Sequence, residues 1–270
     1  MIRKATGWIG AVALTAAVFM SGAASAQDAS NWATPVKPFK IGENLYYVGA
    51  SDLAAYLLVS KAGLIVLDGG DASTGRQVVA NIRTLGFDPA QVKILLNTHQ
   101  HFDHAAGLAE IKRAAPGLKL YASAADGPVI AAGGRGDPFL KGERFYYEPV
   151  KVDGILRDGQ TVSLGGWTLT AHVTGGHTQG CTTWTFPLTV AGKVRQALVH
   201  CSSSVLPGYK LGKSETYPGI TADFEKSFPP SSALRLASRP KNCPWEAMNT
   251  SHGSDFQVAK LFSKSAVIPG

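Results

Sequence analysis

The sequence predicts an α/β fold, a four-layer αβ/βα sandwich built from two halves in which strands precede a helix. Short β-branched and aliphatic runs precede amphipathic segments between residues 39 and 133, and the same order returns between residues 161 and 228. The chain has 270 residues, 45% of them hydrophobic, which is enough for one large core or two small ones. No linker separates the halves, so we expect one domain over residues 27–270, with helices outside two facing sheets.

The first half begins with strands. Three runs rich in β-branched, aromatic and aliphatic residues predict strands in hairpin connection, over residues 39–48, 55–59 and 64–67. A helix follows, capped by Ser73 or Thr74 and ended by Gly86, because apolar residues recur at helical spacing between them. A buried strand over residues 92–97 then leads into a second helical pattern that starts near Leu108.

The remaining segments follow the same rules. Residues 118–122 predict a strand, and an alanine-rich helix ending at Gly133 and a Gly/Pro-rich exposed loop come next. Two hairpins are predicted in the second half, one over residues 161–164 and 167–173 and one over residues 182–190 and 194–199. A helix over residues 219–228 completes the pattern.

The N-terminus predicts export. Arg3 and Lys4 precede an apolar stretch over residues 8–20, and the small residues Ala24-Ser25-Ala26 suit a signal peptidase. The apolar stretch falls short of the ~20 residues that a membrane span needs. We therefore expect residues 1–26 to be a signal peptide and the mature chain to be periplasmic or secreted, with no membrane association after cleavage.

The charge of the chain argues against nucleic-acid binding. The formal net charge is +7, and loss of the signal peptide lowers it by two. The Lys and Arg residues are scattered, without the dense basic and aromatic surface that nucleic acids require. A mild attraction for small anionic substrates is the simpler use of this charge.

Three cysteines in an exported chain predict one disulfide and one remaining thiol. Spacing does not determine the pairing. Cys181 and Cys201 are favoured because each lies in or beside a strand-like run that could be a neighbour of the other in one sheet. Cys243, in a proline-flanked stretch, would be left over.

A dense cluster of metal-binding residue types follows the predicted strand over residues 92–97. His99, His101, Asp103 and His104 offer three imidazoles and a carboxylate within six positions. Zinc takes these ligand types, and a strand-to-helix loop can direct them at two centres. The alternative is a polar surface loop, but four ionisable groups between a buried strand and a helix favour a functional site.

A second candidate ligand is His177, which lies between glycines in residues 175–180. Glycine allows a tight turn that directs one imidazole inward. A lone histidine in such a loop is more often an ordinary loop residue than a metal ligand. Because the cluster after residue 97 needs further ligands, the interpretation as a ligand is favoured here. His172 and His200 are interpreted as structural.

The pattern His-X-His-X-Asp-His after a hydrophobic strand, with Gly-His-Thr downstream, resembles the metallo-β-lactamase superfamily and in particular subclass B3. The resemblance covers most of the mature chain and implies the metallo-β-lactamase fold with two Zn²⁺ ions. The implied ligands of one zinc are His99, His101 and His177. Those of the other are Asp103, His104 and, by order along the chain, His252.

Two features select the subclass. The first is His104. At this position the enzymes of subclass B1 resemble one another in carrying Arg, and they use a cysteine as a zinc ligand. Glyoxalase II and many other members carry a bridging Asp after a later strand, whereas residues 197–201 here run into three serines. The resemblance also implies that Asp68 bonds to a metal-binding histidine and orients it; the alternative is a plain turn residue. It further implies that Ser203 binds the substrate carboxylate, with Ser202 and Ser204 as the alternatives.

The C-terminal region departs from the subclass pattern. Prolines near Phe228 and between residues 239 and 246 prevent a continuous helix there. His252 is retained as a ligand because Ser251-His-Gly-Ser resembles the family's ending and no later histidine exists.

The resemblance implies a hydrolase that opens the β-lactam amide of penicillins, cephalosporins and carbapenems with a hydroxide shared by two zinc ions. Asp103 would orient the hydroxide, and the zinc held by Asp103 and His104 would stabilise the departing nitrogen. We expect a monomer with a small-molecule β-lactam as its partner. The alternatives are a lactonase or thioesterase of the same superfamily, and a non-catalytic exported zinc-binding protein if the second site is not formed. No serine-hydrolase motif occurs.

Overall fold

The computed structural model describes residues 32–212 and 214–227. The predicted signal peptide, Cys243 and His252 lie outside these residues. Two β-sheets form the centre of the described part. Among its helices, none combines the length and apolar character that crossing a membrane requires.

The larger sheet has seven strands in the order β1-β2-β3-β4-β5-β6-β7. Their bounds are β1 Phe39–Gly42, β2 Leu45–Tyr47, β3 Tyr56–Ser60, β4 Gly63–Leu67, β5 Val92–Leu96, β6 Lys119–Ser123 and β7 Gly154–Leu156. Strands β1 to β4 pair in antiparallel fashion, and β4 to β7 pair in parallel. Because β4 and β5 are parallel neighbours, the segments that leave their carboxyl ends emerge side by side.

The smaller sheet has four antiparallel strands in the order β11-β10-β9-β8. Their bounds are β8 Thr161–Leu164, β9 Trp167–Val173, β10 Thr182–Val190 and β11 Lys193–Val199. Both predicted hairpins of the second half are therefore present, within one residue of the predicted bounds.

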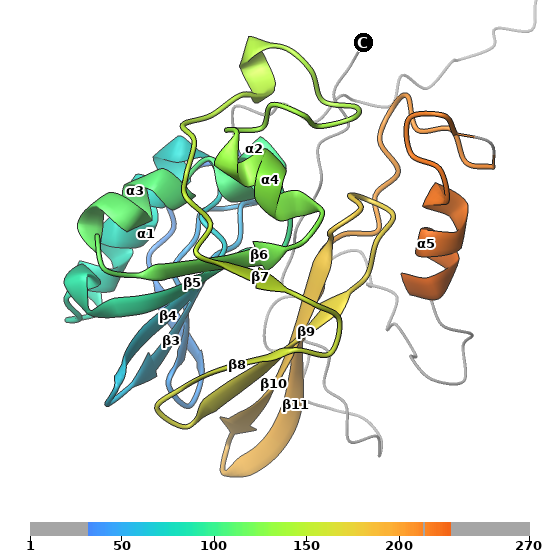
Figure 1. Cartoon of the computed structure of the whole chain (residues 1–270). Coiled ribbons are helices and arrows are strands. Elements are labelled where there is room, and N and C mark those ends of the chain that lie inside the picture. The colour runs from blue at the N-terminus through green and yellow to red at the C-terminus, as the bar shows by residue number, and fades with distance from the viewer. Residues whose placement is uncertain (1–31, 213, 228–270) are drawn as a thin grey trace, which may run out of the picture.

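Five α-helices and two 3-10 turns occur in the described residues. Their bounds are α1 Ala72–Thr84, η2 Pro89–Gln91, α2 Phe102–Ala105, α3 Leu108–Ala114, α4 Asp126–Ala131, η3 Glu143–Phe145 and α5 Ile220–Ser227. Figure 1 shows α1 and α3 on the outer side of the larger sheet and α5 on the opposite side of the molecule, beside the smaller sheet. The layers thus follow the order predicted from the sequence.

Alternation along the strands divides the core in two. Leu57 and Val66 point toward α1 and α3 and pack in one hydrophobic cluster. Leu58 and Ile65 point the other way and pack against the smaller sheet around Trp184. Burial of each such side chain stabilises the fold by roughly 1.5–3 kcal/mol, so the larger sheet is held from both faces.

Three local predictions need correction. The N-cap of α1 is Asp71 rather than Ser73 or Thr74, since its carboxylate accepts from Thr74 N at 2.7 Å. The predicted strand over residues 39–48 is split by a turn in which Asn44 has φ 59°. The histidine run is not a loop throughout, because its second half forms α2.

Candidate metal centre

The histidine run leaves the carboxyl end of β5 and turns at once into α2. His99 and His101 lie before the helix, and His101 is its N-cap residue with φ −67° and ψ 153°. Asp103 and His104 occupy the short helix itself. All four side chains are buried, which for four ionisable groups in six positions requires partners.

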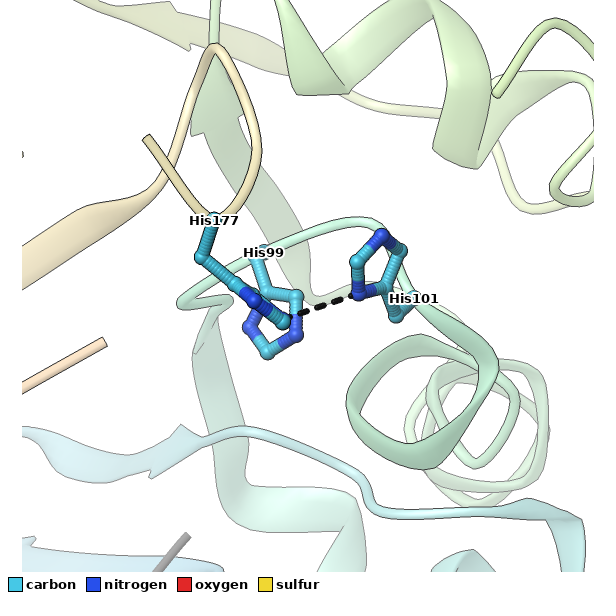
Figure 2. A group of neighbouring side chains, drawn as sticks. All are labelled: His99, His101 and His177. Atoms are coloured by element: carbon cyan, nitrogen blue, oxygen red, sulfur yellow. Dashed lines mark hydrogen bonds between the residues drawn. The ribbon is translucent and has the colours of Figure 1, made fainter. Parts of the chain in front are cut away.

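His99, His101 and His177 form a first group, in which one ring nitrogen of each residue lies within 4.8 Å of the others. His101 Nδ1 and His177 Nε2 are 3.0 Å apart (Figure 2). The first two residues come from the segment after β5, and the third comes from the turn between β9 and β10. Two halves of the chain therefore meet at this group.

His99, Asp103 and His104 form a second group within the same 4.8 Å limit. His104 Nε2 lies 3.9 Å from Asp103 Oδ2. Five of the six ligands implied by the sequence are thus brought together, and the sixth, His252, lies outside the described residues.

The electrostatics of these groups suit a cation. Burial, together with His104, His177 and His101, lowers the pKa of His99 well below its ordinary value, and burial followed by His101 does the same for His177. Both imidazoles are then neutral and present lone pairs, as metal ligands must. His99 Nε2 is buried and has no hydrogen-bond partner among the described residues, so a zinc ion bound there would satisfy it. The donor set therefore fits Zn²⁺.

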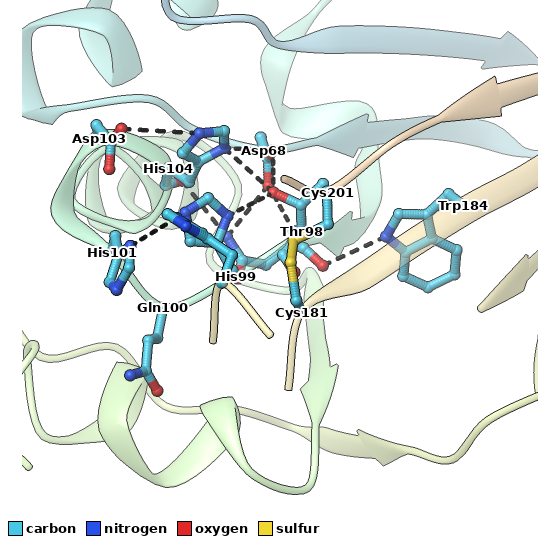
Figure 3. A network of polar contacts seen from close by, with 12 residues as sticks. Asp68, Thr98, His99, Gln100, His101, Asp103, His104, Cys181, Trp184 and Cys201 are labelled. Carbon is cyan, nitrogen blue, oxygen red and sulfur yellow. Dashed lines mark hydrogen bonds and ion pairs between the residues drawn. A yellow bond between two sulfur atoms is a disulfide. The ribbon is translucent and has the colours of Figure 1, made fainter. Parts of the chain in front are cut away.

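Asp68 lies behind the second group (Figure 3). Its carboxylate accepts from Thr98 N at 2.7 Å and from the Thr98 hydroxyl at 2.6 Å, and His104 Nδ1 is 2.8 Å from Oδ2. Burial alone would lower the pKa of His104, but the carboxylates of Asp68 and Asp103 outweigh it and raise that pKa. These contacts place Asp68 where the predicted orienting role requires it, and that role stays a prediction.

The turn that carries His177 is fixed on several sides. His177 Nδ1 is 2.9 Å from the carbonyl oxygen of Ser204, which leaves Nε2 to face His101. Gly176 has φ 128°, a conformation open to glycine, and a Cβ there would lie 2.5 Å from the ring of Phe224. The glycine therefore allows the turn to pack against α5.

The favoured pairing of Cys181 with Cys201 is confirmed, whereas Cys243 lies outside the described residues and its free thiol stays a prediction. Cys181 and Cys201 form a disulfide with Cα atoms 5.8 Å apart, next to the start of β10 and the end of β11. Figure 3 shows this disulfide beside Thr98, whose carbonyl oxygen accepts from Thr182 N at 2.8 Å. The bridge therefore joins the smaller sheet at the edge of the candidate site.

The other predicted residues take the following places. His172 bonds across the smaller sheet to Thr185 at 2.8 Å, and His200 lies 3.4 Å from Thr183 Oγ1, so both are outside the two groups. Ser202 is buried and Ser203 is exposed. The substrate contact of Ser203 stays a prediction.

Two buried carboxylates were missed by sequence reasoning. Asp126 and Asp137 lie beside the first group, and both bond to Gln100. A small pocket of about 160 Å³ opens there, and its walls include Gln100, His101, Asp126, Asp137, His177 and Tyr209. No local pattern signals these contacts, because the residues lie more than twenty positions from Gln100.

Comparison with known proteins agrees with this architecture. A family model described as the metallo-beta-lactamase superfamily matches residues 49–189. The native FEZ-1 metallo-beta-lactamase from Legionella gormanii is 44% identical, with a TM-score of 0.69, over 72% of this chain and 74% of that chain. BJP-1, a subclass B3 metallo-beta-lactamase of Bradyrhizobium japonicum, is 36% identical, with a TM-score of 0.70, over 76% of each chain.

A curated relative, a probable metallo-hydrolase of Burkholderia pseudomallei, is 34% identical over 116 residues. That match covers 40% of this chain and 35% of the relative, so the chain spans about a third of the length of this relative. Taken with the family model and the solved structures, these matches show that the chain belongs to the metallo-β-lactamase superfamily. The predicted αβ/βα sandwich and the similarity to subclass B3 are confirmed.

Proposed function

We propose that this protein is a zinc-dependent hydrolase that opens the amide bond of β-lactams. The observation that carries the proposal is the convergence of the two buried ligand groups, which share His99 and take their other members from the first half and the His177 turn. The names of the two solved relatives, both metallo-beta-lactamases, support β-lactams as the substrate class.

The proposed ligands follow from the groups. His99, His101 and His177 would hold one zinc ion, and Asp103, His104 and His252 would hold the second. When bound, the two ions would supply Lewis-acid activation of a water molecule and of the substrate carbonyl at neutral pH. Their number is part of the proposal, since His252 lies outside the described residues.

Three side chains of the chain would orient a ligand, the water molecule and the substrate. Asp68 accepts from His104 Nδ1 and so keeps Nε2 directed at Asp103. The Asp103 carboxylate, which is buried, would accept a hydrogen bond from the attacking water and orient it. Ser203 is exposed and precedes Ser204, whose carbonyl oxygen lies 2.9 Å from His177 Nδ1, and it would bind the carboxylate of the substrate.

The setting of the enzyme is proposed from the sequence. Removal of residues 1–26 would release a mature single domain over residues 27–270 to the periplasm or the exterior. There it would act as a monomer on small-molecule β-lactams and confer resistance to penicillins, cephalosporins and carbapenems.

A substrate comparison tests the assignment. The mature, zinc-loaded protein would be assayed in parallel against imipenem, benzylpenicillin and a homoserine lactone. We expect turnover of both β-lactams and little or none of the lactone. Turnover of the lactone alone would replace the proposal with a lactonase, and inactivity with zinc bound would favour a non-catalytic binding protein.

A further inference from the structure

Asp137 lies in the loop after α4 and is 6% exposed. The preceding Gly136 has φ 100°, which lets the backbone turn so that the carboxylate points inward. One carboxylate oxygen, Oδ1, accepts from the backbone N–H groups of Phe139 at 2.8 Å and Leu140 at 2.7 Å. This oxygen therefore stabilises the loop itself.

The other oxygen, Oδ2, faces the histidine run. Gln100 Nε2 donates to it at 2.7 Å, and His101 Nε2 lies 3.2 Å from it. The side chains of His101 and Asp137 are only 3% and 4% exposed, so water does not compete strongly for this contact. The two oxygens of one carboxylate thus have separate partners.

This contact determines how His101 can act. An imidazole nitrogen that faces a carboxylate carries the proton, so Nε2–H donates to Asp137 and Nδ1 keeps its lone pair. Nδ1 is the nitrogen that lies 3.0 Å from His177 Nε2, in the first ligand group. In His104 the nitrogens have the opposite roles, because Asp68 holds Nδ1.

Gln100 strengthens the arrangement from the backbone side. Its side chain reaches Asp137, while its backbone N–H donates to Asp126 Oδ2 at 3.1 Å. The Asp126 carboxylate also accepts from the Thr178 hydroxyl at 2.8 Å and from Gly180 N at 2.9 Å, two residues that follow His177 in its turn. The residue between two predicted ligands is therefore anchored at both its main chain and its side chain.

From this geometry we propose that Asp137 is a positioning residue of the metal centre. It holds His101 in the tautomer whose Nδ1 can bind zinc, and it does so from a glycine-rich loop outside both histidine motifs. The inference rests on the proposed function only for the identity of the metal.

The variant Asp137→Asn separates the two roles of the carboxylate. The amide oxygen replaces Oδ1 and still accepts from Phe139 and Leu140, whereas the amide nitrogen replaces Oδ2 and can only donate. The amide nitrogen would donate to His101 Nε2 and so stabilise the tautomer that carries the proton on Nδ1. A protonated Nδ1 has no lone pair with which to bind a metal. We expect zinc affinity, measured by competition with a chromophoric chelator, to fall about 10–100-fold.

Two further readouts make the test specific. The visible spectrum of the cobalt-substituted protein should change in Asp137→Asn, because His101 no longer binds through Nδ1. The melting temperature of the zinc-free protein should stay close to that of the wild type, whereas Asp137→Ala, which also loses the loop bonds, should lower it. Asp88→Asn is the matched control, since exposed Asp88 likewise accepts from a backbone N–H two residues on, at 2.9 Å, and lies before β5, whereas the histidine run follows the other end of that strand.

Unchanged zinc affinity and an unchanged cobalt spectrum in Asp137→Asn would overturn the inference. So would a melting temperature as low as that of Asp137→Ala, because any loss of zinc affinity would then follow from disruption of the loop. A wild type that binds zinc but does not hydrolyse β-lactams leaves the inference standing and removes only the proposed function. A wild type that binds no zinc removes both.

Discussion

Asp68 Oδ2 lies 2.8 Å from His104 Nδ1, and both side chains are buried at the carboxyl ends of the parallel strands β4 and β5. The contact leaves His104 Nε2 as the nitrogen that faces Asp103. A carboxylate that is not itself a predicted ligand thus contacts the ring nitrogen of a predicted ligand that faces away from the second group.

Asp68→Asn should weaken zinc binding about 10–100-fold, because the amide cannot accept from all of the donors that now surround the carboxylate. Asparagine tolerates the φ of 64° at this position, so backbone strain is not added. The free energy of unfolding of the zinc-free protein should fall by about 1–3 kcal/mol. Urea unfolding and chelator competition measure the two effects. Asp71→Asn is the control, since asparagine caps a helix as well as aspartate does, and equal behaviour of the two variants would contradict the role of Asp68.

Asp126 predicts a pH dependence of stability. Burial raises the pKa of its carboxyl from 3.8 to about 6, so the folded chain binds this proton more tightly than the unfolded chain does. The contribution of Asp126 to stability should therefore be greatest below pH 3.8 and should fall on the order of 3 kcal/mol as the pH rises to about 6.

Urea unfolding of the zinc-free wild type and of Asp126→Asn between pH 4 and pH 7 measures this dependence. The free energy of unfolding of the wild type, relative to that of Asp126→Asn, should decrease from pH 4 to pH 7. A difference in the free energy of unfolding that does not change with pH would show that folding does not raise the pKa of Asp126.

Gly180→Ala should disturb the His177 turn by steric overlap. A Cβ at this position would lie 1.9 Å from Ser123 Oγ and 2.5 Å from Asp126 Oδ1. We expect a destabilisation of about 1–3 kcal/mol and weaker zinc binding. Gly117→Ala is the matched control, because a Cβ at Gly117 meets nothing within 4 Å. Equal stability and equal zinc affinity of the two variants would show that the turn tolerates the added methyl group.

The disulfide between Cys181 and Cys201 should contribute about 3 kcal/mol to the free energy of unfolding, as expected for a cross-link across a separation of 20 residues. The double variant Cys181→Ser/Cys201→Ser measures this in urea. Cys243→Ser serves as the control and should leave the unfolding curve in place. Titration of the unreduced, denatured wild type should detect one thiol, and three thiols would show that the pair is not formed.

His252→Ala tests the part of the site that lies outside the described residues. If His252 completes the second ligand group, the variant should retain about one zinc ion per chain where the wild type binds two. Native mass spectrometry counts the ions directly. Two ions in the variant would assign the sixth ligand to another residue.

The strands and the ligand cluster were predictable because their signals are local. Apolar runs such as those of β5 and β10 are bounded by turn residues, and the ligands from His99 to His104 are crowded into one short stretch. The strand β7 was not predicted, because it has three residues and only Leu156 is buried. Its place in the sheet comes from parallel pairing with β6.

The carboxylates around the ligands could be predicted only in part. Asp68 was found through a resemblance, since its sequence context is that of an ordinary turn. Asp126 and Asp137 reach Gln100 across 26 and 37 positions, and nothing in their neighbourhoods indicates that contact. Such partners depend on tertiary packing, which brings α4 and its following loop over the histidine run.

Hydrolysis of imipenem before and after exhaustive chelation tests the central claim most directly. The zinc-loaded mature protein should hydrolyse the carbapenem, lose this activity when the metal is removed, and regain it when zinc is added back. Hydrolysis that persists in protein shown by mass spectrometry to be free of metal would contradict the assignment of a zinc-dependent β-lactam hydrolase.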